Sequence, residues 1–89
     1  AWERDHAVSA AQSEAEIWKL SDERQDGERV LYWDADWKET EDQSAAAYAG
    51  SLTESSKEGG MQNLQIVIRE AGERGEELFM LEAAKYVRP

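Results

Sequence analysis

Apolar side chains recur at helical spacing between about residues 8 and 24. Those on the predicted inner face are Val8, Ala11, Ala15 and Trp18. Serine and Gln or Glu residues at capping-box spacing mark the start of this segment, and "DERQDGE" at 22–28 contains a glycine suited to reversing the chain. The pattern predicts a first helix here, preceded by a polar stretch at 1–6 that we expect to fray.

The next segment, "VLYWDADWKE" at 30–39, alternates as a β-strand does. One face is apolar and consists of Leu31, Trp33, Ala35 and Trp37. The other face begins apolar and becomes acidic, with Val30, Tyr32, Asp34 and Asp36. We therefore expect the first face to lie in the core, with Trp33 buried, and the second face to extend into water.

A second helix is predicted from about 41 to 56. Thr40 and Gln43 have capping-box spacing, and acidic residues between them suit the positive end of a helix. The expected apolar stripe consists of Ala45, Tyr48, Ala49 and Leu52. The glycine-containing segment "SSKEGG" at 55–60 is expected to be a loop.

The last third of the chain supports two assignments. Residues 61–71 fit a helix, but three consecutive β-branched residues at 66–68 favour a strand. A glycine-rich turn follows, and after it comes a second apolar run. We therefore predict an antiparallel hairpin over residues 63–87, turning around Gly72 and Gly75.

Together these elements predict a small α+β fold. The order is helix, strand, helix, strand, strand, which suits a mostly antiparallel three-stranded sheet with helices on one face. A length of 89 residues suits one domain, so we expect residues 1–89 to form a single acidic α+β domain.

The composition restricts the compartment and the chemistry. The chain contains no cysteine, which favours a reducing compartment and leads us to expect a cytoplasmic protein. The same lack of cysteine excludes zinc–thiolate sites and cysteine nucleophiles. No apolar run approaches membrane-spanning length, so we expect no membrane partner.

The net charge is -10, and it is unevenly distributed. Residues 1–45 contain 13 acids and 5 bases, whereas residues 46–89 contain 7 acids and 5 bases. Direct binding of nucleic acid needs clustered Lys and Arg, so we do not expect nucleic acid as a partner. Solubility alone is one explanation of the acidity.

Few residues suggest catalysis or metal binding. Asp34 and Asp36 form a D-x-D pair whose carboxylates would lie about 6.6 Å apart on one strand face, but a metal needs several converging ligands. His6 is the only histidine, and it sits in the segment expected to fray. No nucleophile elbow or phosphate-binding glycine loop occurs. We therefore expect no catalytic residue, no metal site and no cofactor.

The densest acidic run is "DADWKETED" at 34–42, with five acids and one base. Aromatic residues among the acids are typical of interface hot spots. These features predict a non-catalytic binding or inhibitor protein that docks onto a basic protein surface, such as that of a nucleic-acid-binding enzyme, with carboxylates in place of phosphates. The predicted partner-binding residues are Tyr32, Asp34, Asp36, Trp37, Glu39, Glu41 and Asp42.

Two alternatives remain open at the sequence level. One is a structural or assembly subunit that self-associates, for example as a homodimer, through the wide apolar face of the first helix or through a sheet edge. The other is a metal-dependent enzyme that uses Asp34 and Asp36.

Overall fold

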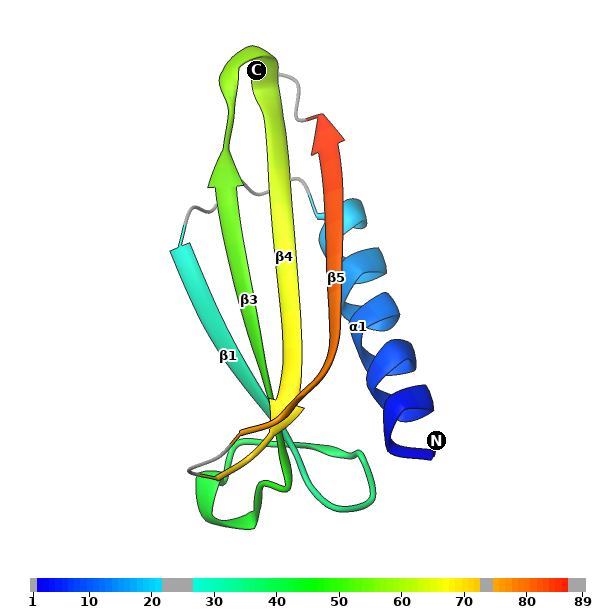
Figure 1. Ribbon diagram of the computed structural model, residues 1–89. Helices are drawn as coiled ribbons and strands as arrows, with labels where there is room; N and C mark the ends of the chain where they lie inside the picture. The colour runs from blue at the N-terminus through cyan, green and yellow to red at the C-terminus, as the bar shows by residue number, and fades with distance from the viewer. Residues whose placement is uncertain (1, 22–26, 73–74, 87–89) are drawn as a thin grey trace.

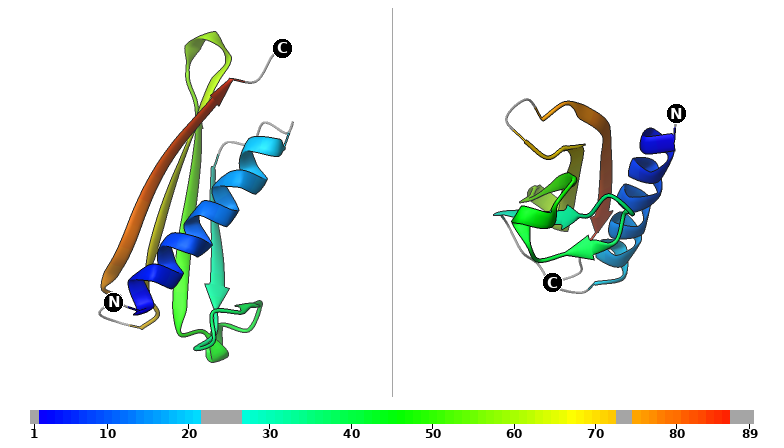
Figure 2. Two further views of the ribbon diagram at one scale, coloured as in Figure 1. Left: turned by 90° about the vertical axis from the view of Figure 1, so that its right-hand side faces the viewer. Right: turned by 90° about the horizontal axis from the view of Figure 1, so that it is seen from below.

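The computed structural model describes residues 2–21, 27–72 and 75–86 of the chain. In this part of the chain a single helix precedes one antiparallel sheet of five strands in the order β2-β1-β3-β4-β5. The helix lies across one face of the sheet, and the other face is open (Figures 1 and 2). The elements are α1 (Trp2–Leu20), β1 (Gly27–Trp33), β2 (Glu39–Thr40), η1 (Gln43–Ala45, a 3-10 turn), β3 (Tyr48–Ser56), η2 (Glu58–Gly60, a 3-10 turn), β4 (Met61–Glu70) and β5 (Glu77–Tyr86).

The small α+β class is confirmed, but the second helix and the three-stranded sheet were wrong predictions. Instead of a helix over 41–56, the chain forms the short turn η1 and then strand β3. Alternate residues of β3 are buried, from Tyr48 through Gly50 to Leu52, so the apolar residues that suggested a helical stripe also fit a strand. A glycine at position 50 disfavours a helix interior by about 1 kcal/mol, whereas the sheet uses it.

The use of Gly50 is steric. A Cβ built on this residue would lie 2.7 and 2.8 Å from two atoms of the Trp33 ring. The ring of Trp33, at the end of β1, therefore packs directly over the Gly50 backbone on the neighbouring strand. Trp33 is 5 % exposed, which confirms its predicted burial.

The C-terminal hairpin, predicted over 63–87, is confirmed in the described part of the chain, whereas residues 73, 74 and 87 lie outside it. Strands β4 and β5 pair antiparallel from Met61↔Tyr86 to Arg69↔Glu77, with a register shift between Ile68 and Arg69. The alternative of a helix over 61–71 is excluded by this pairing. The first helix also differs from its prediction, because it begins at Trp2 rather than near residue 8 and ends at Leu20. The helix was predicted to continue to residue 24, but residues 22–24 lie outside the described residues.

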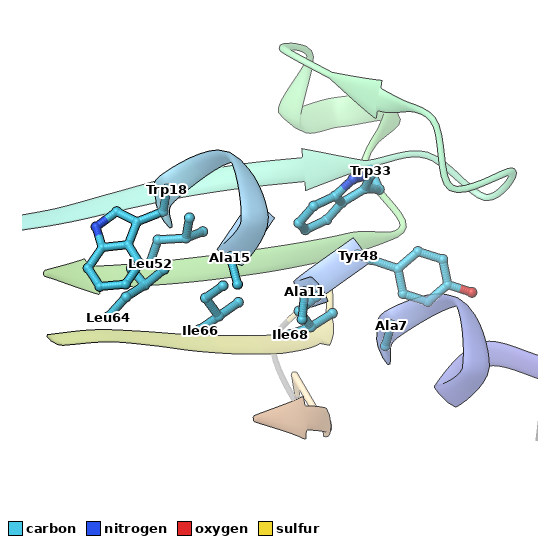
Figure 3. Packing of buried hydrophobic residues seen from close by; sticks show 10 residues of the cluster. All are labelled: Ala7, Ala11, Ala15, Trp18, Trp33, Tyr48, Leu52, Leu64, Ile66 and Ile68. Atoms are coloured by element: carbon cyan, nitrogen blue, oxygen red, sulfur yellow. The ribbon is translucent and has the colours of Figure 1, made fainter. Parts of the chain in front are cut away.

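Small side chains let α1 approach the sheet closely. Ala7, Ala11 and Ala15 are buried on its inner face, and in Figure 3 they point toward the apolar residues of the sheet. Spaced four residues apart, they line one side of the helix. The fully buried side chains beneath are Leu52, Leu64, Ile66 and Ile68. This core fixes α1 against β4 and β5 and so determines where each end of the helix lies.

The C-terminal end of α1 is capped from the sheet. Nζ of Lys85, on β5, donates hydrogen bonds to the backbone oxygens of Trp18 and Ser21, the latter at 2.8 Å. The same ammonium lies 4.5 Å from the centroid of the Trp18 ring. A cation suits the negative end of the helix dipole, so this contact links the last turn of α1 to the last strand.

No helix among the described residues combines the length and the apolar character needed to cross a membrane.

Candidate functional site

The loop between β1 and β2 holds the centre of the predicted acidic site. The sequence pattern predicted that Asp34 and Asp36 share one face of a strand, and this is wrong. Strand β1 ends at Trp33, so both residues lie in the loop. Oδ1 of Asp34 accepts hydrogen bonds from the backbone N–H groups of Asp36 (2.9 Å) and Lys38 (3.0 Å). Two backbone hydrogen bonds, from Trp37 N to Asp34 O and from Asp34 N to Lys38 O, close the turn. The Asp34 carboxylate is thus committed to shaping the loop.

Trp37 ends this turn in the left-handed region, with φ 63°. That conformation is unfavourable for a bulky residue and persists only where the surroundings enforce it. Here the indole stacks on Tyr48 with ring centroids 3.9 Å apart and an interplanar angle of 14°. The ring centroids of Trp37 and Trp33 are 6.1 Å apart. Trp37 thus lies near Trp33 because the loop folds back toward the end of β1.

The first turns of α1 complete an aromatic cluster. The His6 ring is stacked nearly parallel to Trp37 at a centroid distance of 5.8 Å, and Trp2 meets His6 edge-on at 4.5 Å. Trp2 remains 58 % exposed. The cluster therefore joins the N-terminal end of the helix to the β1–β2 loop. Sequence reasoning missed Trp2 and His6, although their spacing of four residues would place them together on any helix that began this early.

Acidic residues from three separate segments gather at this same end of the sheet. Residues 2–6 carry two acids and one base, 34–42 carry five and one, and 69–72 together with 75–77 carry three and one. Figure 1 shows the start of α1, the β1–β2 connection, the end of β4 and the start of β5 at one end of the molecule. We call these segments the acidic end. The local excess of carboxylates thus exceeds what the run at 34–42 alone predicted.

The predicted site residues differ in accessibility. The half-buried ones are Tyr32, Asp34 and Trp37, and the exposed ones are Asp36, Glu39, Glu41 and Asp42. Tyr32 lies on β1 opposite Thr40 and Ala49, on the sheet face away from α1. Asp36, Glu39 and Glu41 are exposed carboxylates. Asp42 is exposed too, but its carboxylate accepts hydrogen bonds from Ser44, and Asp34 and Trp37 shape the loop.

Hydrogen bonds and burial shift three pKa values around the acidic end and its flank. Hydrogen bonds from the Ser44 side chain and backbone lower the pKa of Asp42, which caps η1. Burial, followed by the nearby carboxylates of Glu3 and Glu70, raises the pKa of the Tyr48 hydroxyl. On the inner flank of α1, burial and then Glu39 raise the pKa of Glu14, and Arg29 partly offsets them. Glu14 and Glu39 thus bring the helix and β2 into one electrostatic environment.

Asp34 and His6, which were considered for metal binding, have other contacts at this end of the protein. Among the described residues, no group of three or more His, Asp or Glu side chains is placed to hold a metal ion. Asp34 uses its carboxylate on backbone amides, and the His6 ring is engaged by two indoles. The geometry thus offers exposed carboxylates and the exposed Trp2 indole at the same end of the protein.

Comparison of the chain with protein-family models, with curated proteins and with solved structures found no match.

Proposed function

We propose that this protein is a small, non-catalytic binding protein whose acidic end docks onto a basic surface of a partner protein. The observation that carries the proposal is the gathering of acidic segments from α1, the β1–β2 loop and the β4–β5 turn around the exposed Trp2. Opposite charge would steer the encounter, and an exposed indole beside carboxylates would supply an apolar anchor for the bound state.

Rigidity of the acidic end supports the proposal. Trp37 is held against Tyr48 and His6, and Asp34 fixes the loop from which Asp36 projects. A surface that is already ordered loses little conformational entropy on binding. The partner class that fits is a protein with a basic groove, such as a nucleic-acid-binding enzyme, because carboxylates can occupy the positions of phosphates. The chain's lack of cysteine supports a reducing, cytoplasmic setting for this encounter.

The test begins with affinity capture from the native host, followed by binding kinetics of the captured partner. The variant carries Asp36→Asn, Glu39→Gln and Glu41→Gln, which leaves the structural Asp34 intact. We expect its association rate to fall severalfold at low salt and the difference to shrink as salt screens exposed charges. If Trp2 contacts the partner in the bound state, the complex of the Trp2→Ala variant should dissociate faster than that of the parent.

A matched control removes the same charge elsewhere. The substitutions Glu16→Gln, Glu58→Gln and Glu82→Gln lie on exposed positions outside the acidic end. If this control slows association as much as the acidic-end variant, then only net charge matters and the proposed docking surface is wrong.

A second candidate function is a self-associating assembly subunit, which one observation favours. β5 is the last strand in the sheet, so its outer edge has no strand partner over ten residues of the described chain, and unpaired edges template strand addition. α1 also exposes Ile17 (62 %) and Leu20 (86 %). Sedimentation over a concentration series distinguishes the two functions, because a self-associating subunit would dimerise without a partner and a Leu20→Glu variant would weaken the dimer.

A further inference from the structure

The sheet face opposite α1 carries a polar grid at the end remote from the acidic end. Two cross-strand rows form it on β3, β4 and β5. The first row is Thr53, Gln65 and Glu82, and the second row is Ser55, Asn63 and Ala84. Neighbouring strands lie about 4.8 Å apart and alternate residues about 6.8 Å apart, so the grid covers roughly 10 by 7 Å.

This grid forms the floor of a hollow of about 430 Å³. Lys57 lies at its margin, where β3 leads into η2. Pockets for small ligands are typically about 300–1,000 Å³, so the hollow is of adequate size. Ala84 contributes to the depth because its side chain is the smallest in either row. A larger side chain there would fill space between Asn63 and the strand edge.

The groups in the hollow select for an uncharged, hydroxyl-rich ligand. Two amides and two hydroxyls can both donate and accept hydrogen bonds, so they can pair with an alcohol in either direction. Nε2 of Gln65 already donates to Sδ of Met80 (3.3 Å), which leaves its second N–H and its amide oxygen for a ligand. One carboxylate, on Glu82, and one ammonium, on Lys57, balance in charge. The chain as a whole carries -10, which repels an anion. The usual small-ligand pocket is mostly apolar, whereas polar and apolar surface line this one about equally.

An exposed aromatic residue follows the hollow along β5, on the same sheet face. Tyr86 is two residues beyond Ala84 on β5, so its side chain lies on the same sheet face, and it is 73 % exposed. An aromatic ring with a polar tip suits a ligand that has one apolar C–H face and hydroxyls around its rim. A pyranose ring has this combination.

We propose that this hollow binds a neutral saccharide, with Gln65 and Asn63 as the central hydrogen-bonding residues and Tyr86 as the stacking platform. The proposal is independent of the acidic end, which lies at the opposite end of the strands. Asn63 and Gln65 occupy alternate positions of β4, so both amides face the ligand from the middle strand of the grid. Glu82 accepts from a sugar hydroxyl at the margin on β5.

The test uses isotope-labelled protein titrated with glucose, galactose and maltose, and with glucuronate and glucosamine as charged probes. We expect saturable backbone amide shifts confined to residues 53–57, 63–65 and 82–86 with at least one neutral sugar. Gln65→Leu should weaken that binding by tenfold or more. Gln12→Leu, on the exposed side of α1, is the matched control and should bind like the parent.

A second variant protects the test against misfolding. Ala84→Phe fills the hollow without removing any polar group, and it should abolish the shifts while the amide spectrum outside the hollow stays that of the parent. The proposal is overturned if no neutral sugar shifts these amides at about 10 mM, if only a charged probe does so, or if Ala84→Phe binds like the parent. None of these outcomes bears on the acidic end, so the two proposals fail separately.

Discussion

The two faces of the sheet are made from neighbouring residues of the same strands, yet they serve opposite purposes. On β3, Tyr48, Gly50 and Leu52 face α1 and are buried, while Ala49 and Ser51 face away and are half-buried. On β4 the buried residues of the covered face are Gln62, Leu64, Ile66 and Ile68, whereas the alternate residues, which include Asn63, Gln65 and Arg69, face away. A shift of one residue in register would exchange these two surfaces, so the apolar set on the covered face fixes the register. The covered face secures the fold, whereas the open face and the strand ends carry the surfaces for which we propose binding.

The largest difference between the covered and the open face of the sheet is expected at Trp33. Truncation to alanine removes a buried indole from the covered face and should cost about 3–5 kcal/mol. That is a large share of the roughly 5–15 kcal/mol that stabilises a small domain, so we expect the variant to unfold at a much lower denaturant concentration than the parent. Chemical denaturation of parent and variant gives the difference. A melting temperature within a few degrees of the parent would mean that the covered face does not depend on this ring.

Gly50 and Ala49 offer a matched pair on the two faces. Gly50→Val places a Cβ against the Trp33 ring and should destabilise the protein by about 1–3 kcal/mol, whereas Ala49→Val, on the open face, should cost under about 0.5 kcal/mol. Denaturant titration measures both changes.

The steric cause can be isolated with a double variant. If the Trp33 ring is what excludes a side chain, Gly50→Val should cost much less in the Trp33→Ala background. Equal costs in both backgrounds would point to the strand backbone as the source of the effect.

Some elements of the fold were predictable from the sequence and others were not. The burial of Trp33 and the β4–β5 hairpin were predicted correctly, because the alternation of apolar residues and the β-branched residues there agree with the final packing. Strand β3 was not predicted, because Tyr48 and Leu52 satisfy a helical and a strand period equally. The glycine between them disfavours a helix weakly, and its close contact with Trp33 on the neighbouring strand cannot be seen in the sequence. Of the acidic end, the run at 34–42 was readable, but its neighbours Glu3 and Glu70 were not, since tertiary pairing alone brings them there.

Lys85 tests the polar boundary of the covered face. Lys85→Met keeps the aliphatic stem but removes the ammonium that binds the Trp18 and Ser21 carbonyls, so we expect a loss of about 1–2 kcal/mol. Lys38→Met, on an exposed loop position, is the matched control and should be close to neutral. Amide hydrogen exchange should speed up in the last turn of α1 before it does elsewhere. Unchanged exchange in that turn would mean that the cap does not hold the helix end.

Glu14 provides the smallest and most specific test, because it lies between the covered face and water. Its pKa is raised from the ordinary 4.5 by burial first and Glu39 second, against the attraction of Arg29. A carboxyl whose pKa is raised on folding binds protons more tightly in the folded state, so its ionised form opposes folding. That penalty is present above the raised pKa and disappears as the pH falls through it and below 4.5.

Glu14→Gln should therefore stabilise the protein at neutral pH by less than about 1 kcal/mol, since the site is partly exposed and screened. Thermal melts should separate the parent from Glu14→Gln at pH 7 and bring them together in acid, while Glu16→Gln, on the exposed side of α1, should show no such convergence. A gain at pH 7 that persists unchanged in acid would show that the effect comes from packing rather than from the charge.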